Sequence, residues 1–369
     1  MAMACDPVIL AAPGVRGLVP YQPGKPIEEL ERELGVTGAI KLASNENPYG
    51  PGAKAKAAAA AALAQMERYP DGGGFALKRA LAHRLAVSER QITLGNGSND
   101  VLELIARTFL CPGETALCDE HAFAAYAISV RGIGAHMIEV PSRAYAHDLD
   151  AMAHALSPSV RMVFLANPNN PTGTWFGREE LAGFLAAVPA STIVVLDEAY
   201  LEYVTEPDYP DGCGFLARHP NLVVVRTFSK IHGLAGLRVG YAVSDPALAE
   251  LMNRLRQPFN VNIVAQAAAV AALADKAHVE RMRAVNAADR ATLAAALRDH
   301  GLGVLPSVGN FLCVEVGDAA RLYEALLRQG VIVRPLKPYG MTAHLRITVG
   351  RPEENARLLR ALADIMRAA

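Results

Sequence analysis

The stretch NLVVVRTFSKIHGLAGLRVGYAV, residues 221–243, places a lysine just beyond a valine-rich apolar run. The run at 222–225 is too short to cross a membrane and is β-branched, which predicts a buried strand leading into a polar turn. Lys230 then follows a strand end, where α/β proteins place their chemistry. A lysine amine there can attack a carbonyl group, because burial and nearby cations lower its pKa. Most lysines are simply exposed, so the interpretation depends on what the chain brings near Lys230.

Two further apolar runs end in polar residues in the same way. The run at 160–165 is followed by NPNNPTG, which contains Asn170, and the run at 193–196 is followed directly by Asp197. Amphipathic helical stretches separate the runs, which predicts βαβ units and a mainly parallel sheet. Because parallel strands end at one edge of their sheet, we expect Asn170, Asp197 and Lys230 to lie in one site.

A glycine turn precedes a further amphipathic helix in ITLGNGSNDVLELIARTFL, residues 92–110. A glycine turn that enters a helix exposes unpaired N–H groups at the positive end of the helix dipole. Gly97, Ser98 and Asn99 are therefore candidates for binding a phosphate. An ordinary helix cap formed by Ser98 or Asn99 explains the same pattern.

Bulk composition narrows the class of partner. Lys plus Arg number 36 and Asp plus Glu number 37, a net charge of −1, which argues against a nucleic-acid or anionic-membrane surface and favours small-molecule or protein partners. No apolar run is long enough to cross a bilayer, and the first residues lack the basic start and long apolar core of a signal peptide. The five cysteines are odd in number and scattered, which favours free thiols in the cytoplasm over disulfides or a metal site: Cys5, Cys111, Cys118, Cys213 and Cys313.

Changes in pattern along the chain predict two domains and an N-terminal arm. Residues 1–40 form an arm with a short helix that packs with the small domain, 41–255 form the large domain, and 256–369 form a smaller α+β domain reached through alanine-rich helices. Within the smaller domain, Arg346 lies in the apolar run HLRITVG. A buried arginine needs an anionic partner, which is either a bound carboxylate or phosphate or an interdomain salt bridge.

The segments SKIHGLAGLRVGY, NPNNPTG and VVLDEAY, in this order and at this spacing, resemble the pyridoxal-phosphate aminotransferases of fold type I over nearly the whole chain. YQPGKPIEELERELG, KLASNENPYGP, RYPDG and HLRITVG are similar to the histidinol-phosphate aminotransferases in particular. The resemblance implies an α/β fold with a mainly parallel seven-stranded sheet between helices, plus the smaller α+β domain. It also implies pyridoxal 5'-phosphate as the cofactor.

The resemblance assigns catalytic roles to Lys230, Asp197 and Tyr200 and a cofactor contact to Asn170. Lys230 would bind the cofactor aldehyde covalently and, once released, move the proton between substrate and cofactor. Asp197 would keep the pyridine nitrogen protonated, which makes the ring an electron sink. Asn170 and Tyr200 would donate hydrogen bonds to the phenolic oxygen of the ring.

The same resemblance implies the remaining contacts to the cofactor. Phe123 would stack on the ring, with Tyr126 as the alternative. Tyr49 would reach the phosphate from the neighbouring subunit, which implies a homodimer with shared active sites. The phosphate would otherwise be held by main-chain amides, hydroxyls and one guanidinium, contributed by Gly97, Ser98, Asn99, Thr227, Ser229 and Arg238.

The implied reaction is a ping-pong transfer of the amino group of glutamate to imidazole-acetol phosphate in histidine biosynthesis. Arg346 would bind the carboxylate of one substrate and the phosphate of the other, assisted by Arg334, Tyr21 and Asn170. An aromatic amino acid aminotransferase of the same fold is the nearest alternative, and a decarboxylase acting on an amino acid phosphate is a more distant one. A non-catalytic binding protein would not need Lys230 beside an electron-sink aspartate.

Overall fold

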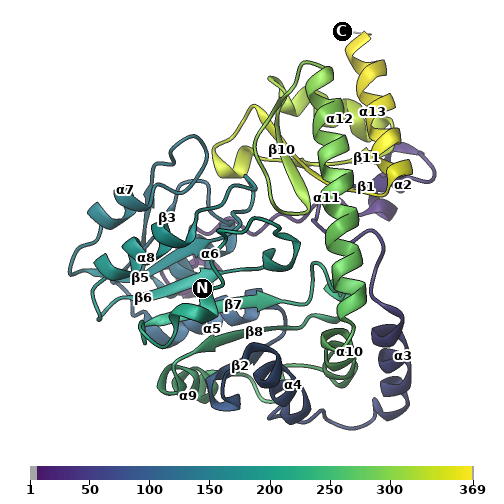
Figure 1. The fold of residues 1–369 in the computed structure, drawn as a ribbon. Helices are drawn as coiled ribbons and strands as arrows, with labels where there is room; N and C mark the ends of the chain where they lie inside the picture. Colours follow the sequence, from purple (N-terminus) through teal and green to yellow (C-terminus); the bar gives the residue numbers. More distant parts are fainter. Residues whose placement is uncertain (1–5, 368–369) are drawn as a thin grey trace, which may run out of the picture.

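The computed structural model describes residues 6–367, which form two bodies connected by a long helix (Figure 1). The larger body contains a seven-stranded sheet with the strand order β2-β8-β7-β6-β5-β3-β4. Strand β8 runs antiparallel to both neighbours, and the pairs from β7 to β4 are parallel. The strands are β2 (Ile92–Gly95), β3 (Thr115–Asp119), β4 (His136–Val140), β5 (Val160–Ala166), β6 (Ile193–Asp197), β7 (Leu222–Thr227) and β8 (Gly240–Ser244). The predicted mainly parallel seven-stranded sheet is confirmed.

Helices cover both faces of this sheet, so its central strands are apolar except near their ends, where Arg161, Asp197 and Arg226 lie. Along β5, Val163 and Leu165 join one core while Met162 and Phe164 join the core on the opposite face. This alternation follows from the two-residue period of a strand, and burial on both faces explains why the strands are continuous apolar runs. The helices of this body are α3 (Ala53–Ala62), α4 (Phe75–Leu85), α5 (Ser98–Phe109), α6 (Ala124–Ile133), α7 (Leu149–His154), α8 (Arg178–Ala187), α9 (Pro246–Leu255) and α10 (Ile263–Leu273).

The smaller body combines a four-stranded sheet, a two-stranded sheet and three helices. The four-stranded sheet is antiparallel, with the order β12-β13-β10-β9. In the two-stranded sheet, β1 near the N-terminus pairs in parallel with β11. Leu30 of α2 packs with Leu327 and Ile332, so α2 contributes to the core of this body. The elements are α2 (Ile27–Leu34), β1 (Ile40–Lys41), β9 (Gly303–Val304), β10 (Phe311–Glu315), α12 (Ala319–Arg328), β11 (Val331–Ile332), β12 (Arg334–Pro335), β13 (His344–Thr348) and α13 (Pro352–Arg367).

The connection between the bodies is α11 (Lys276–Asp299), which rises from α10 to the smaller body (Figure 1). Ala265 and Ala268 of α10 pack in the large-body core together with residues of α3 and α4. In α11, by contrast, Leu293 and Leu297 pack in the core of the smaller body. We therefore propose that the domain boundary lies within α11 rather than at residue 256.

The N-terminal arm, which includes α1 (Pro7–Leu10), runs along the large body before it reaches α2. A Cβ atom at Gly14 would collide with the carbonyl oxygen of Arg131 and with Gly134, so the arm backbone lies directly against the end of α6. This contact requires a glycine at position 14, while Gly134, the last residue of RGIG, ends the helix in a left-handed conformation.

Two predictions from composition can be compared with the described residues. Within 6–367, no helix has the length and apolar character needed to span a bilayer. Four of the cysteines are free thiols, namely Cys111, Cys118, Cys213 and Cys313. The fifth, Cys5, lies outside the described residues.

Because Leu165 is fully buried in β5, we predict that Leu165→Ala lowers the free energy of unfolding by about 2–5 kcal/mol through lost apolar contact and a residual cavity. Chemical denaturation followed by circular dichroism measures the change. Leu251→Ala on α9, where the side chain is 38% exposed, is the matched control and should cost clearly less. Equal losses in both variants would contradict the burial of this sheet on both faces.

Candidate active site

A cavity of about 350 Å³ lies at the carboxyl ends of β5, β6 and β7, between the two bodies. It collects most of the residues that the sequence singled out, although they come from all parts of the chain. Gly97 and Tyr49 are the predicted residues that do not line it. The predicted residues along its wall are Tyr21, Ser98, Asn99, Phe123, Asn170, Asp197, Tyr200, Thr227, Ser229, Lys230, Arg238, Arg334 and Arg346, together with the alternative Tyr126.

Lys230 follows the end of β7 and contributes an amine to the cavity. Its Nζ lies 3.3 Å from the carbonyl oxygen of Ser44 and 5.3 Å from the centroid of the Tyr200 ring. Burial, together with the positive charge of Arg346, lowers the pKa of Lys230 to about 8. A substantial fraction of this amine is therefore neutral near pH 8 and can act as a nucleophile or a base.

Asp197, at the end of β6, is held in one orientation by two hydrogen bonds. Its Oδ2 accepts from the hydroxyl of Tyr126 at 2.7 Å, and its Oδ1 accepts from the main-chain N–H of Ala199 at 3.1 Å. Burial raises the pKa of Asp197, while both hydrogen bonds and Lys230 oppose that rise. The carboxyl group is therefore positioned beside the cavity as a hydrogen-bonding partner.

The two candidate stacking residues have different environments. The ring of Tyr126 stacks on Phe164, with centroids 4.7 Å apart and planes 11° from parallel. Its hydroxyl is bonded to Asp197. Phe123, at the start of α6, makes edge contacts with Tyr126 and Tyr21. Phe123 is thus the member of the pair without a stacked aromatic neighbour among the described residues.

Groups suited to binding an anion lie where α5 begins. Gly97 has a φ of 88°, and a Cβ atom there would collide with the guanidinium of Arg238. Nη1 of Arg238 lies 3.5 Å from Oγ of Ser229, whose own contact to Oγ1 of Thr227 is 3.0 Å. No carboxylate within residues 6–367 forms an ion pair with Arg238. The helix N-terminus, two hydroxyls and a guanidinium therefore suit a phosphate group.

Two buried arginines face each other across the small-body sheet. Arg334 of β12 and Arg346 of β13 are direct register partners and are only 6% and 4% exposed. Arg346 donates to the carbonyl of Ala43 at 2.6 Å and to Oδ1 of Asn170. The Nε atoms of both arginines are buried without a hydrogen-bond partner in the described chain.

This arrangement decides between the two interpretations of Arg346. No interdomain salt bridge to Arg346 or Arg334 forms among residues 6–367. Like charges directly opposite each other in a sheet are destabilising, and an unpaired buried charge costs several kcal/mol. The pair is consequently suited to an anionic ligand. Tyr21 lies beside it, with its ring centroid 5.5 Å from Cζ of Arg334.

Sequence reasoning missed part of the site. Asn45 donates to the hydroxyl of Tyr200 at 2.9 Å and has a φ of 55°, which its short polar side chain tolerates. It lies in the quoted segment KLASNENPYGP, where that polar side chain before the NPYG turn was the available signal. The donor role of Tyr126 toward Asp197 was also missed, because a hydrogen bond between residues 71 positions apart leaves no local pattern.

Comparison with known proteins gives similarity over nearly the whole chain. The family model described as aminotransferase class I and II matches residues 37–362. Histidinol-phosphate aminotransferase 2 of Pseudomonas fluorescens is 55% identical over 99% of each chain, and histidinol-phosphate aminotransferase 1 of Nitrosococcus oceani is 54% identical over 97% of each. The crystal structure of histidinol-phosphate aminotransferase from Sinorhizobium meliloti, in complex with pyridoxal-5'-phosphate, has a TM-score of 0.90 at 31% identity and covers 96% of this chain and 97% of its own.

We predict that Lys230 in the ligand-free protein loses its proton near pH 8, because burial and Arg346 disfavour the charged amine. Competitive acylation over a pH series, followed by peptide mass spectrometry, measures this titration, with the exposed Lys54 as the reference. Arg346→Gln should shift the Lys230 titration to higher pH, because it removes a nearby positive charge. A Lys230 titration that matches Lys54, or that Arg346→Gln leaves unmoved, would contradict this assignment.

Proposed function

The chain belongs to the class I and II aminotransferases and, within them, to the histidinol-phosphate aminotransferases, and from this membership we propose its reaction. It transfers the amino group of L-glutamate to imidazole-acetol phosphate, giving L-histidinol phosphate and 2-oxoglutarate. The observation that carries this choice of substrate is the buried pair Arg334 and Arg346, which has no counter-anion in the described chain. A phosphate ester carries more negative charge than a single carboxylate and suits two adjacent guanidinium groups.

We propose pyridoxal 5'-phosphate as the cofactor, and the residues present fit it. Ser98, Asn99, Thr227, Ser229 and Arg238 would hold its phosphate, because they surround the start of α5 at one end of the cavity. Gly97 belongs to this group because any side chain there would displace Arg238. When bound, the cofactor supplies a ring that delocalises negative charge from the substrate carbon.

The chain's own groups then hold and move protons. Lys230 would bind the cofactor aldehyde through Nζ and, once released, carry a proton to and from the substrate carbon, which its lowered pKa favours. Asp197, fixed by Tyr126 and Ala199, would hold the proton on the pyridine nitrogen. Tyr200, oriented by Asn45, would donate to the ring oxygen.

Two further roles follow from the surroundings of the cavity. Asn170 is already bonded to Arg346, so it can orient that guanidinium toward a substrate anion as well as face the ring oxygen. Phe123 would cover the ring face, because Tyr126 is already stacked on Phe164 and bonded to Asp197. Tyr21 lies between Phe123 and Arg334, where it can exclude water from a bound substrate.

We further propose a homodimer in which Tyr49 serves the partner's site. Tyr49 does not line its own chain's cavity, and its hydroxyl lies 3.3 Å from Oδ2 of Asp289 on α11. The guanidinium of Arg351 lies 5.4 Å from the centroid of its ring. These contacts hold Tyr49 against α11 and outside the cavity that contains Lys230 of its own chain, and a partner chain is where it can meet a cofactor phosphate.

We predict that, with glutamate as the donor, imidazole-acetol phosphate is aminated with a higher kcat/KM than phenylpyruvate. Arg334→Gln should lower kcat/KM for the phosphate substrate by about 10- to 100-fold, because hydrogen bonds to charged groups contribute about 1.5–3 kcal/mol. The exposed Lys337→Gln is the charge-matched control, and Lys230→Ala should abolish transfer. Faster amination of phenylpyruvate, or equal losses from Arg334→Gln and Lys337→Gln, would refute the substrate assignment.

We predict that mixing inactive Lys230→Ala chains with impaired Tyr49→Ala chains restores about a quarter of wild-type activity. Half of randomly re-formed dimers are hybrids, and each hybrid contains one site with both residues intact. Activity after joint unfolding and refolding is the measurement. Mixing Lys230→Ala with Arg346→Ala is the control and should restore none, because we assign both residues to one chain. Failure of the first mixture to exceed its parents would remove the shared-site proposal.

A further inference from the structure

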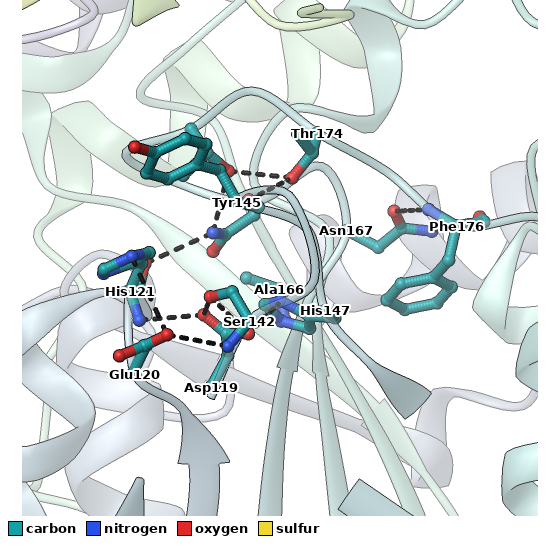
Figure 2. A network of polar contacts seen from close by, with 12 residues as sticks. Asp119, Glu120, His121, Ser142, Tyr145, His147, Ala166, Asn167, Thr174 and Phe176 are labelled. Atoms are coloured by element: carbon teal, nitrogen blue, oxygen red, sulfur yellow. Dashed lines mark hydrogen bonds and ion pairs between the residues drawn. The ribbon is translucent and has the colours of Figure 1, made fainter. Parts of the chain in front are cut away.

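We propose that Asp119 and His147 are positioning residues that fix the loops carrying Phe123 and Asn170, and that His147 does so as a neutral imidazole with its hydrogen on Nδ1. This inference rests on the proposed function, because Phe123 and Asn170 matter through the cofactor and substrate they are assigned to hold. Neither Asp119 nor His147 belongs to the site as the sequence or the preceding description defined it. Figure 2 shows the network of polar contacts that they form.

Asp119 ends β3 and is 1% exposed. Its Oδ1 accepts a hydrogen bond from the main-chain N–H of His121 at 2.8 Å and another from Oγ of Ser142 at 2.9 Å. The carboxylate therefore closes the turn between β3 and α6 and ties it to the loop at 141–148. Phe123 is the residue immediately before α6, so the orientation of its ring depends on this turn.

His147 connects the same carboxylate to the end of β5. Its Nε2 lies 3.2 Å from the main-chain nitrogen of Ala166, and its Nδ1 lies 3.6 Å from Oδ2 of Asp119. A main-chain N–H can only donate, so Nε2 is the acceptor and the hydrogen of the neutral ring is on Nδ1. Nδ1 has no closer hydrogen-bond partner in the described chain, and the nearby carboxylate of Asp119 favours a hydrogen on Nδ1, which is the tautomer that Ala166 requires. Burial also lowers the pKa of His147, which keeps the ring neutral.

The network also fixes the NPNNPTG turn that follows β5. Asn169 donates from Nδ2 to the carbonyl of His121 at 3.2 Å, and Thr174 donates from Oγ1 to the carbonyl of Tyr145 at 3.1 Å (Figure 2). The turn is thus bonded on one side to the β3–α6 turn and on the other to the loop that carries His147. Asn170 lies within it and contacts Arg346.

Taken together, these contacts link three segments through one buried carboxylate and one buried imidazole. Ala166 lines the cavity itself, beside Asn170 and Phe123. Removal of the His147 ring would leave the N–H of Ala166 without its partner at the strand end from which the turn departs. The expected result is a less well positioned turn rather than a missing contact to the substrate, so both cofactor affinity and turnover should fall.

The tautomer is tested on the wild-type protein by NMR. Histidine labelled with ¹⁵N gives different ring-nitrogen shifts for the two neutral tautomers and for the charged ring, and the His147→Gln spectrum identifies the His147 signals. We expect a neutral ring protonated on Nδ1 at pH 7.5. A ring protonated on Nε2, or on both nitrogens, would overturn the proposal, whatever substrate the enzyme uses.

The positioning role is tested with three variants of the full-length protein. His147→Ala should weaken binding of pyridoxal 5'-phosphate, measured by absorbance titration of the cofactor-free protein, by roughly tenfold, since a buried donor loses its partner. His147→Gln, whose side-chain oxygen can accept from Ala166, should recover most of that loss. The control is Thr192→Val, which removes a 2.8 Å hydrogen bond to the carbonyl of Val160 at the opposite end of β5.

The outcomes separate positioning from general destabilisation. Thr192→Val should lower the melting temperature while leaving cofactor affinity and kcat unchanged. Unchanged cofactor affinity in His147→Ala, or losses equal to those of Thr192→Val, would overturn the positioning role. If His147→Ala does not fold, Asp119→Asn provides the same comparison. An amide NH2 group that faces Nδ1 favours the tautomer with its hydrogen on Nε2, and that tautomer cannot accept the N–H of Ala166. The cofactor titration needs no substrate, so a wrong substrate assignment leaves this test intact.

Discussion

Burial of both faces of the seven-stranded sheet is the constraint on which the rest of the structure depends. Side chains alternate between two apolar cores along β5 and β7, so the middle of each strand is apolar and polar groups lie near its ends. They can be placed only where the strands end, and there they are partly removed from water. The lowered pKa of Lys230 and the raised pKa of Asp197 share this cause, since desolvation disfavours the charged form of each.

The smaller body supplies two adjacent positive charges, those of Arg334 and Arg346, which the seven-stranded sheet does not provide. Placing Arg334 opposite Arg346 in a buried sheet opposes folding. A bound anion removes that opposition, and a ligand at a hundred times its Kd stabilises a folded protein by about 2.7 kcal/mol. Stability and substrate selection are therefore linked through Arg334 and Arg346. The ligand that best neutralises these two charges also removes the repulsion between them in the sheet.

Much of this arrangement could be predicted from sequence, because the decisive signals are local. An apolar run followed by a polar residue identified Asn170, Asp197 and Lys230, and a lone arginine in an apolar strand identified Arg346. Contacts between distant segments left no such signal. The bond from Tyr126 to Asp197 and the Asp119–His147 pair depend on how separate loops meet at the sheet edge. The domain boundary that we propose within α11 also has no local signal, because α10 and α11 are both alanine-rich although they pack in different cores.

The pairing of β1 with β11 has a consequence for how the chain reaches this state. Strand β1 pairs with a segment that lies much later in the chain, so its partner is synthesised only after the strands of the large sheet. Leu30 likewise can be buried in its native core only after Leu327 and Ile332 have been synthesised. The large sheet can assemble from neighbouring segments during translation, whereas the smaller body needs a loop closure that spans most of the chain. We therefore expect the cavity to be completed late in folding, and β1 and α2 to be open to association with other chains until then.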